Sequence, residues 1–191
     1  MIKMKNKTRC AWCLKDPIYI NYHDKEWGHP VHDDQKLFEF LVLESFQAGL
    51  SWLTVLKKRE NFRKAFAGFN AKKVAGFDKR KVEQLMQDAG IIRNRLKIEA
   101  AINNAKCYLA IQKEFGSFDK YVWGFVKGKT IVNNRNSLKN TPAKTPLSDA
   151  MSKDMGKRGF KFRGSTICYA FMQAVGMIDD HANDCWKKIK V

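Results

Sequence analysis

The stretch that most constrains the fold of this chain runs from Leu37 to Trp52, with the sequence LFEFLVLESFQAGLSW. Its apolar side chains fall on nearly every side of the helix that it predicts. A helix that is apolar almost all round is buried in a protein core. The polar residues and the glycine at 47–51 then predict that this helix ends before Trp52.

Two acids interrupt the apolar stretch. Glu39 and Glu44 are five residues apart, about 140° around a helix, so they face different ways. Glu39 follows Lys36 by one turn, and we expect it to reach water. Glu44 has only apolar neighbours one turn away, so its carboxylate should be buried, which is costly without a partner. A buried acid beside Trp52 indicates a pocket wall, although an acid satisfied within the core remains an alternative.

The charge of the chain indicates a polyanionic partner. The 191 residues include 36 Lys and Arg against 19 Asp and Glu, for a net charge of +17. The basic residues are spread through the whole sequence, which favours nucleic acid over an acidic membrane or a targeting signal. The alternative is a generally lysine-rich proteome with no polyanion bound.

The composition also indicates the compartment. No stretch approaches the about 20 apolar residues that span a bilayer, and no apolar run follows the basic N-terminus, so a secretory signal is not expected. Five cysteines, an odd number, argue against a disulfide scaffold. We expect a soluble, cytoplasmic, monomeric protein whose cysteines are structural, metal-bound or incidental.

Helical periodicity and capping residues predict an all-α fold in a single domain, 1–191. No internal repeat and no alternating strand pattern is evident in the sequence. A loose tail is expected at 1–8 and a surface loop at 128–146. Helices are predicted over about 17–27, from a cap at Asp33-Asp34 to 47, and over about 52–66, 71–76, 79–87, 93–114, 118–126, 148–157 and 166–177.

The segment 10–29 is rich in aromatic and metal-binding residues. Tyr19, Tyr22, His23 and Glu26 recur at helical spacing, so they share one side of the predicted helix. Such a stripe is typical of a core face, but its hydroxyls and imidazole also suit a binding surface.

A turn at 88–92 separates two predicted helices, so that residues 79–113 form a helical hairpin. We expect Gly90 to supply the turn. The amide groups of the turn should point outward and, with Arg93, Arg95 and Lys97 beside them, suit a DNA phosphate. An ordinary pair of antiparallel helices is the alternative.

Both ends of the chain carry possible zinc ligands. His181 and Cys185 form an i, i+4 pair, and Cys10 and His23 stand near the N-terminus. Two cysteines and two histidines would make a closed, structural zinc site joining residues 10–23 to residues 181–185. A set with Cys13 in place of His23 is also consistent with the sequence, as is the absence of a metal.

Long motifs in this chain resemble the 3-methyladenine DNA glycosylase I family of the helix-hairpin-helix DNA glycosylases. They are RCAW, DPIYINYHDKEWG, LFEFLVLESFQAGLSWLTVLKKRENFRKAF, QDAGIIRNRLKIEAAINNA, KRGFKFRGSTICYAFMQAVGMIDDH and the terminal His-x3-Cys.

The resemblance implies a two-lobed helical fold and cleavage of 3-methyladenine from alkylated double-stranded DNA. It also implies DNA anchoring by the hairpin at Gly90, although Cys13 adds a thiol beside the implied zinc ligands. The resemblance assigns zinc to Cys10, His23, His181 and Cys185, and the base pocket to Trp12, Tyr19, Tyr22, Glu44 and Trp52.

The implied reaction requires the base to leave the duplex. Gly49 and Leu50 are candidates to fill the space that it vacates. Glu44 would bind the methylated base or act in catalysis, and the sequence leaves the two roles open. No loop bearing an aspartate follows the hairpin, which predicts a monofunctional hydrolase. A non-catalytic DNA-binding module and a bifunctional lyase are the competing hypotheses.

Overall fold

The computed structural model describes residues 7–136 and 141–190. Most of the tail predicted at 1–8, and residues 137–140 of the predicted loop, lie outside them. The elements are η1 (Ala11–Lys15), α1 (Pro17–Lys25), α2 (Asp34–Gln47), α3 (Trp52–Ala65), η2 (Ala67–Phe69), α4 (Ala71–Ala75), α5 (Lys79–Gln87), α6 (Arg95–Phe115), α7 (Phe118–Gly124), β1 (Ile131–Val132), α8 (Pro146–Lys157), α9 (Ser165–Ala174) and β2 (Ile178–Asp179).

Side-chain caps explain why most helices begin where the sequence predicts. Asp16, Ser51 and Asp78 each accept a hydrogen bond from a backbone amide in the first turn of α1, α3 and α5. Such a bond satisfies an amide that has no partner inside the helix. Asn94 does the same for α6, which therefore starts at Arg95, two residues later than predicted.

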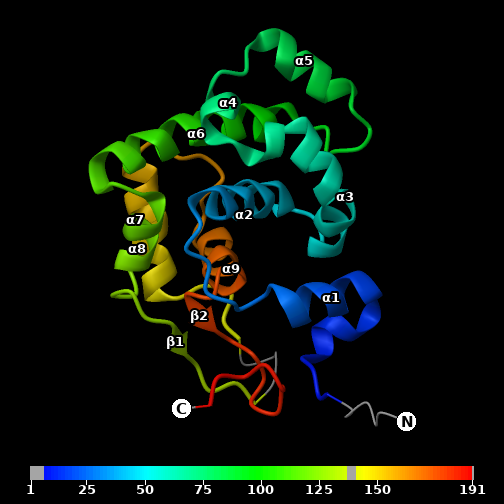
Figure 1. Ribbon diagram of the computed structural model, residues 1–191, viewed down its shortest axis with the longest axis vertical. Coiled ribbons are helices and arrows are strands. Elements are labelled where there is room, and N and C mark those ends of the chain that lie inside the picture. Colours follow the sequence, from blue (N-terminus) through cyan, green and yellow to red (C-terminus); the bar gives the residue numbers. More distant parts are fainter. Residues whose placement is uncertain (1–6, 137–140, 191) are drawn as a thin grey trace.

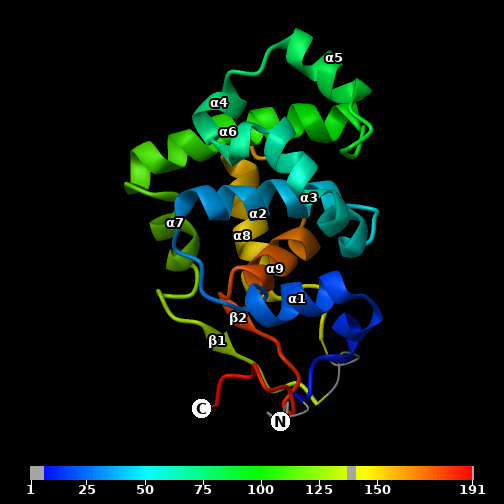
Figure 2. The same cartoon turned by 45° about the vertical axis from the view of Figure 1, so that its right-hand side comes forward.

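Helix α2 crosses the middle of the molecule (Figures 1 and 2) and contacts α3, α6, α7 and α9. Ten consecutive residues from Leu37 to Phe46 are buried, which confirms the buried helix predicted from the sequence. In both views α4 and α5 lie above α2, and α1 and the two strands lie below it.

The prediction that Glu39 reaches water is wrong. Its side chain is buried and accepts hydrogen bonds from Arg59 Nε at 2.6 Å and Arg63 Nη2 at 2.8 Å, both from α3. Arg59 is itself buried and also pairs with Glu26. The cause is the packing of α3 against α2, which brings opposite charges together inside the protein.

Two strands were not predicted. β1 and β2 pair in parallel, with Ile131 opposite Ile178 and Val132 opposite Asp179. Each strand has only two residues, too few for an alternating pattern to be seen in the sequence. The pair attaches the segment after α7 to the segment after α9.

Gly90 lies in the turn between α5 and α6 but not for the predicted reason. Its φ is not in the left-handed region; instead, a Cβ at this position would lie 2.9 Å from Asp88 Oδ1 and 3.0 Å from Asn61 Nδ2. The amides of Gly90 and Ile91 donate to Asp88 and therefore do not point outward, contrary to expectation. The close approach of neighbouring groups is what requires glycine here.

We predict that the buried ion pair at Glu39 contributes much more to stability than an exposed one. Glu39→Ala leaves Arg59 buried without its nearest partner, and we expect a loss of about 3 kcal/mol in the free energy of unfolding. Glu83→Ala, which removes the exposed partner of Arg95, should cost less than about 1 kcal/mol. Urea denaturation measures both, and equal losses would contradict the prediction.

Candidate active site and metal cluster

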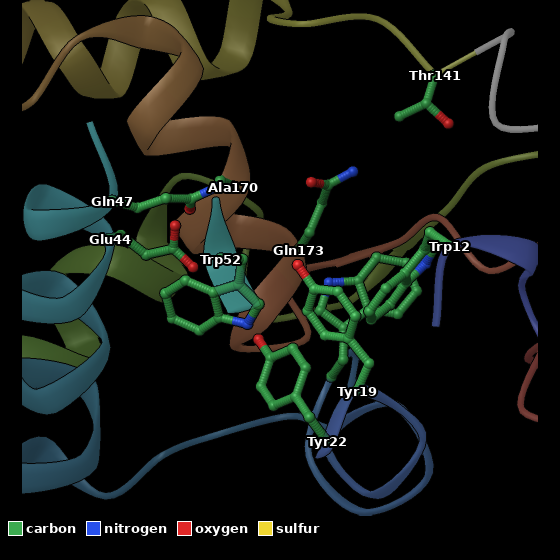
Figure 3. Close-up of a pocket in the computed structure, with 10 residues that line it drawn as sticks. Trp12, Tyr19, Tyr22, Glu44, Gln47, Trp52, Thr141, Ala170 and Gln173 are labelled. Carbon is green, nitrogen blue, oxygen red and sulfur yellow. The ribbon is translucent and has the colours of Figure 1, made fainter. Parts of the chain in front are cut away.

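A cavity of about 250 Å³ opens between α1, α2, α3 and α9. Figure 3 shows its lining residues, which come from both ends of the chain. All five predicted base-pocket residues line it: Trp12, Tyr19, Tyr22, Glu44 and Trp52. Trp27, Gln47, Thr141, Ala170 and Gln173, which were not predicted, complete the wall.

The aromatic rings of the cavity hold one another in fixed orientations. Trp12 and Tyr19 meet edge to face with ring centroids 5.4 Å apart, and Tyr22 lies 5.5 Å from Trp52. The Tyr19 hydroxyl accepts a hydrogen bond of 2.9 Å from the Leu53 amide, which joins α1 to the start of α3. Aromatic faces arranged around a space attract a cation that enters it.

Glu44 is buried in this cavity, as predicted. Its side chain is 4% exposed, and no group of the described residues hydrogen-bonds its Oε2 atom. Burial alone raises the pKa of Glu44 to about 8. The carboxyl group is therefore mostly neutral at pH 7, and a cationic ligand would favour its ionised form.

The wall residues that were not predicted differ in how clearly the sequence marks them. Gln47 lies three residues after Glu44, on the same side of a buried helix, so its position could have been inferred. Ala170 and Gln173 share one side of α9, but neither residue type marks a pocket. Thr141 follows an irregular segment whose course no periodicity predicts.

Cys10, His23 and Cys185 form a buried cluster that could hold a metal ion. Their possible ligand atoms all lie within 4.8 Å of one another. His23 Nε2 lies 3.4 Å from Cys185 Sγ, while its Nδ1 contacts Asp24 Oδ1 at 2.9 Å. A hydrogen bond with Cys10, and another with His23, hold the pKa of the Cys185 thiol below its usual range.

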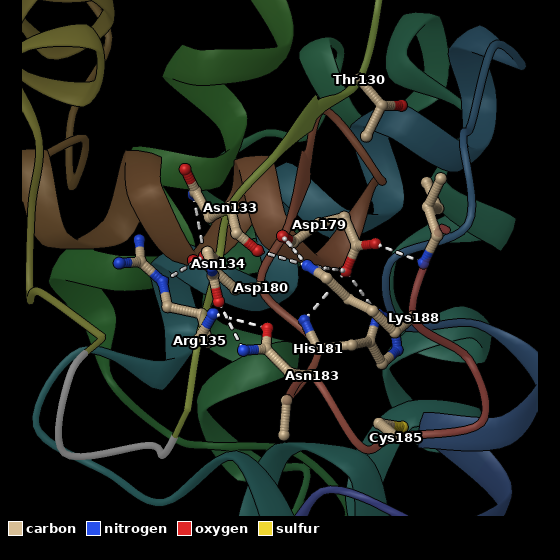
Figure 4. Close-up of polar contacts among 12 residues, drawn as sticks. Thr130, Asn133, Asn134, Arg135, Asp179, Asp180, His181, Asn183, Cys185 and Lys188 are labelled. Atoms are coloured by element: carbon tan, nitrogen blue, oxygen red, sulfur yellow. Dashed lines mark hydrogen bonds and ion pairs between the residues drawn. The ribbon is translucent and has the colours of Figure 1, made fainter. Parts of the chain in front are cut away.

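His181, the fourth predicted ligand, lies next to this cluster but is not part of it. Its ring centroid is 5.2 Å from that of His23. His181 Nδ1 contacts Asp179 Oδ1 at 2.9 Å (Figure 4), and the buried Nε2 atom has no hydrogen-bond partner among the described residues. Cys13 is also outside the cluster, and its thiol donates to the Cys10 carbonyl at 3.1 Å.

The cluster lies where the two ends of the described chain meet. The Ala182 amide donates to Cys10 Sγ at 3.3 Å, and the Trp186 amide donates to the Thr8 carbonyl at 2.9 Å. These hydrogen bonds join the segment that carries Cys10 to the segment that follows His181, and a zinc ion at this junction stays a prediction.

The residues predicted to contact DNA differ in their surroundings. Gly49 has φ +77°, and Leu50 beside it is 42% exposed, so this turn presents an apolar side chain to solvent. Arg93 is exposed, and Arg95 is exposed but paired with Glu83 at 2.7 Å.

Lys97 does not lie on the surface, contrary to the prediction. It is 6% exposed, and its ammonium group donates to the carbonyls of Phe46, at 2.8 Å, and Ala48. These carbonyls are at the C-terminal end of α2, where a cation is favoured by the unpaired backbone oxygens. Lys97 therefore fixes the start of the turn that carries Gly49 and Leu50.

Comparisons with known proteins agree on one family. Residues 12–188 match the family described as methyladenine glycosylase. The chain is 53% identical over 178 residues to a protein of Haemophilus influenzae named DNA-3-methyladenine glycosylase. The aligned region covers 93% of this chain and 96% of that protein.

Solved structures show the same likeness. A crystal structure of 3-methyladenine DNA glycosylase I has a TM-score of 0.93 and 50% identity, over 95% of this chain and all of that chain. A variant of 3-methyladenine DNA glycosylase I in complex with 3-methyladenine has a TM-score of 0.92 and 40% identity, over 95% of this chain and 98% of the other. In the described part of this chain, no helix is long and apolar enough to cross a membrane.

The pKa of Glu44 predicts a specific dependence of stability on pH. Between the ordinary carboxyl pKa and about 8, the folded protein keeps a proton that the unfolded chain has released, so stability falls as the pH rises through this window. Glu44→Gln removes that penalty. As the pH rises through this window, we expect the free energy of unfolding of Glu44→Gln to increase relative to that of the unsubstituted protein by up to about 1.4 kcal/mol per pH unit.

Urea denaturation at several pH values between 5 and 8 tests this prediction. Glu99→Gln is the matched control, because Glu99 is exposed on α6. A difference between Glu44→Gln and the unsubstituted protein that stays constant with pH would show that the burial of Glu44 does not perturb its ionisation.

Proposed function

Because this chain belongs to the methyladenine glycosylase family, we propose that it excises 3-methyladenine from alkylated double-stranded DNA and leaves an abasic site. The chain is a DNA glycosylase, a hydrolase of the N-glycosyl bond. The observation that supports the substrate most directly is Glu44, a buried acid without a partner for Oε2 inside an aromatic cavity.

Recognition of the base rests on its charge. Methylation at N3 makes the purine of the nucleotide cationic and weakens its glycosidic bond before any enzyme acts. Each aromatic face of the cavity attracts a cation by roughly 0.5–2 kcal/mol. Glu44 becomes an anion as the cation enters and accepts hydrogen bonds from the base. Neutral adenine gains less from these interactions, which favours the methylated base.

Access to the base requires that it flip out of the duplex. The turn at Gly49 and Leu50 supports a role in filling the vacated space, because Leu50 is an exposed apolar side chain beside the end of α2. Helix α2 also carries Glu44, one turn before its C-terminal end. Insertion of Leu50 would therefore place the flipped nucleotide near the entrance of the cavity.

The hairpin of α5 and α6 is the proposed DNA anchor of the helix-hairpin-helix type. The amides of Ile92 and Arg93 have no hydrogen-bond partner among the described residues, unlike those of Gly90 and Ile91. Unpaired amides before the N-terminus of α6, with the Arg93 guanidinium beside them, suit a phosphate. The net charge of +17 favours the same partner.

We propose that water is the nucleophile and that the enzyme is monofunctional. α6 continues unbroken from the hairpin to Phe115, so no loop there presents an acid. Two acids near the end of α6, Glu114 and Asp119, are engaged elsewhere, the first with Arg158 and the second with His32. None of the described residues that line the cavity is a lysine able to attack the sugar.

The metal cluster is proposed to hold a structural zinc ion with Cys10, His23, His181 and Cys185 as ligands. The donor set fits zinc, because both histidines contact a carboxylate through Nδ1 and leave Nε2 available. The unpartnered Nε2 of His181 supports it as the fourth ligand. Four protein ligands leave no open position, so the ion would stabilise the joined termini and take no part in hydrolysis.

The reaction can be tested directly by base release. We expect methylated duplex DNA incubated with the protein to release free 3-methyladenine without strand cleavage, as measured by chromatography of the bases and electrophoresis of the DNA. Glu44→Gln should slow release at least about tenfold, because the neutral amide cannot ionise against the cationic base.

The control for base release is Glu99→Gln, which should act as the unsubstituted protein does. DNA binding without base release would favour the non-catalytic binding module instead. A covalent adduct trapped by borohydride would identify a bifunctional lyase.

Loss of the metal should affect stability more than chemistry. We expect Cys185→Ala to abolish zinc binding and lower the melting temperature, because the joined termini lose a ligand, while base release per folded molecule falls much less. Cys13→Ala is the control and should keep one zinc ion per chain. Metal analysis measures the zinc content of each variant, and thermal melting measures its stability. Identical melting of the unsubstituted protein with and without a chelator would contradict the proposed site.

A further inference from the structure

Gln173 lines the same cavity as Glu44, on the wall that α9 contributes (Figure 3). Its amide nitrogen Nε2 donates a hydrogen bond of 2.7 Å to Asp180 Oδ2. The proposed recognition of the base by charge does not involve this residue. A glutamine amide has a donor end and an acceptor end, so the end that faces the cavity decides which base it can bind.

Asp180 is surrounded by hydrogen-bond donors. It is 2% exposed and accepts from Tyr169 Oη at 2.5 Å, from Asn133 Nδ2 at 2.9 Å and from Arg135 Nε at 2.7 Å. Figure 4 shows how Asn133 and Arg135, from the segment after β1, reach Asp180 beyond the end of α9. The guanidinium nitrogen can only donate, so Asp180 is held as a carboxylate that accepts from all sides.

The carboxylate fixes the orientation of the Gln173 amide. If the amide were turned over, its oxygen would face Asp180 Oδ2, and two acceptors would meet without a proton between them. The nitrogen therefore faces Asp180 and the oxygen is left to the cavity. No group of the described residues hydrogen-bonds Gln173 Oε1, so this acceptor is available to a ligand.

We propose that Gln173 is a specificity-determining residue whose Oε1 accepts a hydrogen bond from the exocyclic amino group of a 6-aminopurine, and that Asp180 is its positioning residue. The proposal rests on the proposed function, since it concerns the base bound in that cavity. A 6-oxopurine presents an oxygen at the same position and would face Oε1 without a proton between them. Gln173 thus selects adenine-type over hypoxanthine-type and guanine-type bases.

Binding of free bases tests the role of Gln173. The probes are 3-methyladenine and 3-methylhypoxanthine, which differ at position 6, and the fluorescence of Trp12 and Trp52 in the cavity wall reports binding. We expect the unsubstituted protein to prefer 3-methyladenine. Gln173→Met keeps the length of the side chain and removes the acceptor. It should weaken binding of 3-methyladenine about threefold to tenfold and change that of 3-methylhypoxanthine less than about twofold.

Gln112→Met is the matched control. Gln112 Nε2 also donates to a carboxylate, Asp34 Oδ2 at 2.6 Å, but Gln112 does not line the cavity. Its substitution should leave the affinities for both bases unchanged. Equal weakening of both bases by Gln173→Met would overturn the proposal and leave Gln173 as a residue that only fills space.

Asp180→Asn tests the positioning role. An asparagine can present its amide nitrogen to Gln173 and allow the glutamine to turn its own nitrogen toward the cavity. The preference should then shift toward 3-methylhypoxanthine, whereas a merely structural role would weaken both bases alike. If this variant does not fold, Gln173→Met still decides the proposal.

The assay separates failure of this inference from failure of the proposed function. If the unsubstituted protein releases 3-methyladenine from methylated DNA but Gln173→Met keeps the unsubstituted preference, only the role of Gln173 is wrong. If the unsubstituted protein neither binds 3-methyladenine nor releases it from DNA, the proposed function itself fails.

Discussion

The burial of α2 on all sides is the constraint on which the rest of the structure depends. A helix with apolar side chains around its whole circumference gains stability only when other elements cover every side. Contacts from α3, α6, α7 and α9 provide that cover. The polar groups at the ends of α2 then need partners, and Lys97 provides one for the carbonyls of Phe46 and Ala48. Both the core and the Gly49–Leu50 turn therefore follow from the burial of one helix.

The two acids of α2 are both buried, but only one of them has a counter-ion. Glu39 and Glu44 are both almost inaccessible to water. Arginines of α3 neutralise Glu39, whereas no cation among the described residues neutralises Glu44, and its pKa rises to about 8. An acid left without its counter-ion costs stability. That cost is consistent with a site prepared for a cation that arrives from outside.

Local features of the sequence predicted most of the fold, whereas contacts between distant segments were harder to foresee. Caps such as Asp78 and Asn70 act within a few residues, so the starts of α5 and α4 were predicted correctly. The surroundings of Glu39 and Lys97 were mispredicted because their partners lie far away in the chain. The predicted base-pocket residues do line one cavity, but Gln173 joins them through the packing of α9, for which the sequence offers no local signal.

The meeting of the two ends of the chain has a consequence for biosynthesis. The cavity takes Trp12, Tyr19 and Tyr22 from residues made early and Ala170 and Gln173 from residues made late. Cys10 is likewise made well before Cys185, which lies beside it in the folded protein. A nascent chain stalled before α9 would therefore already contain the hairpin and most of the basic residues, yet it would lack one wall of the cavity. Such a fragment could not enclose a base until α9 had been made and had packed against the other walls.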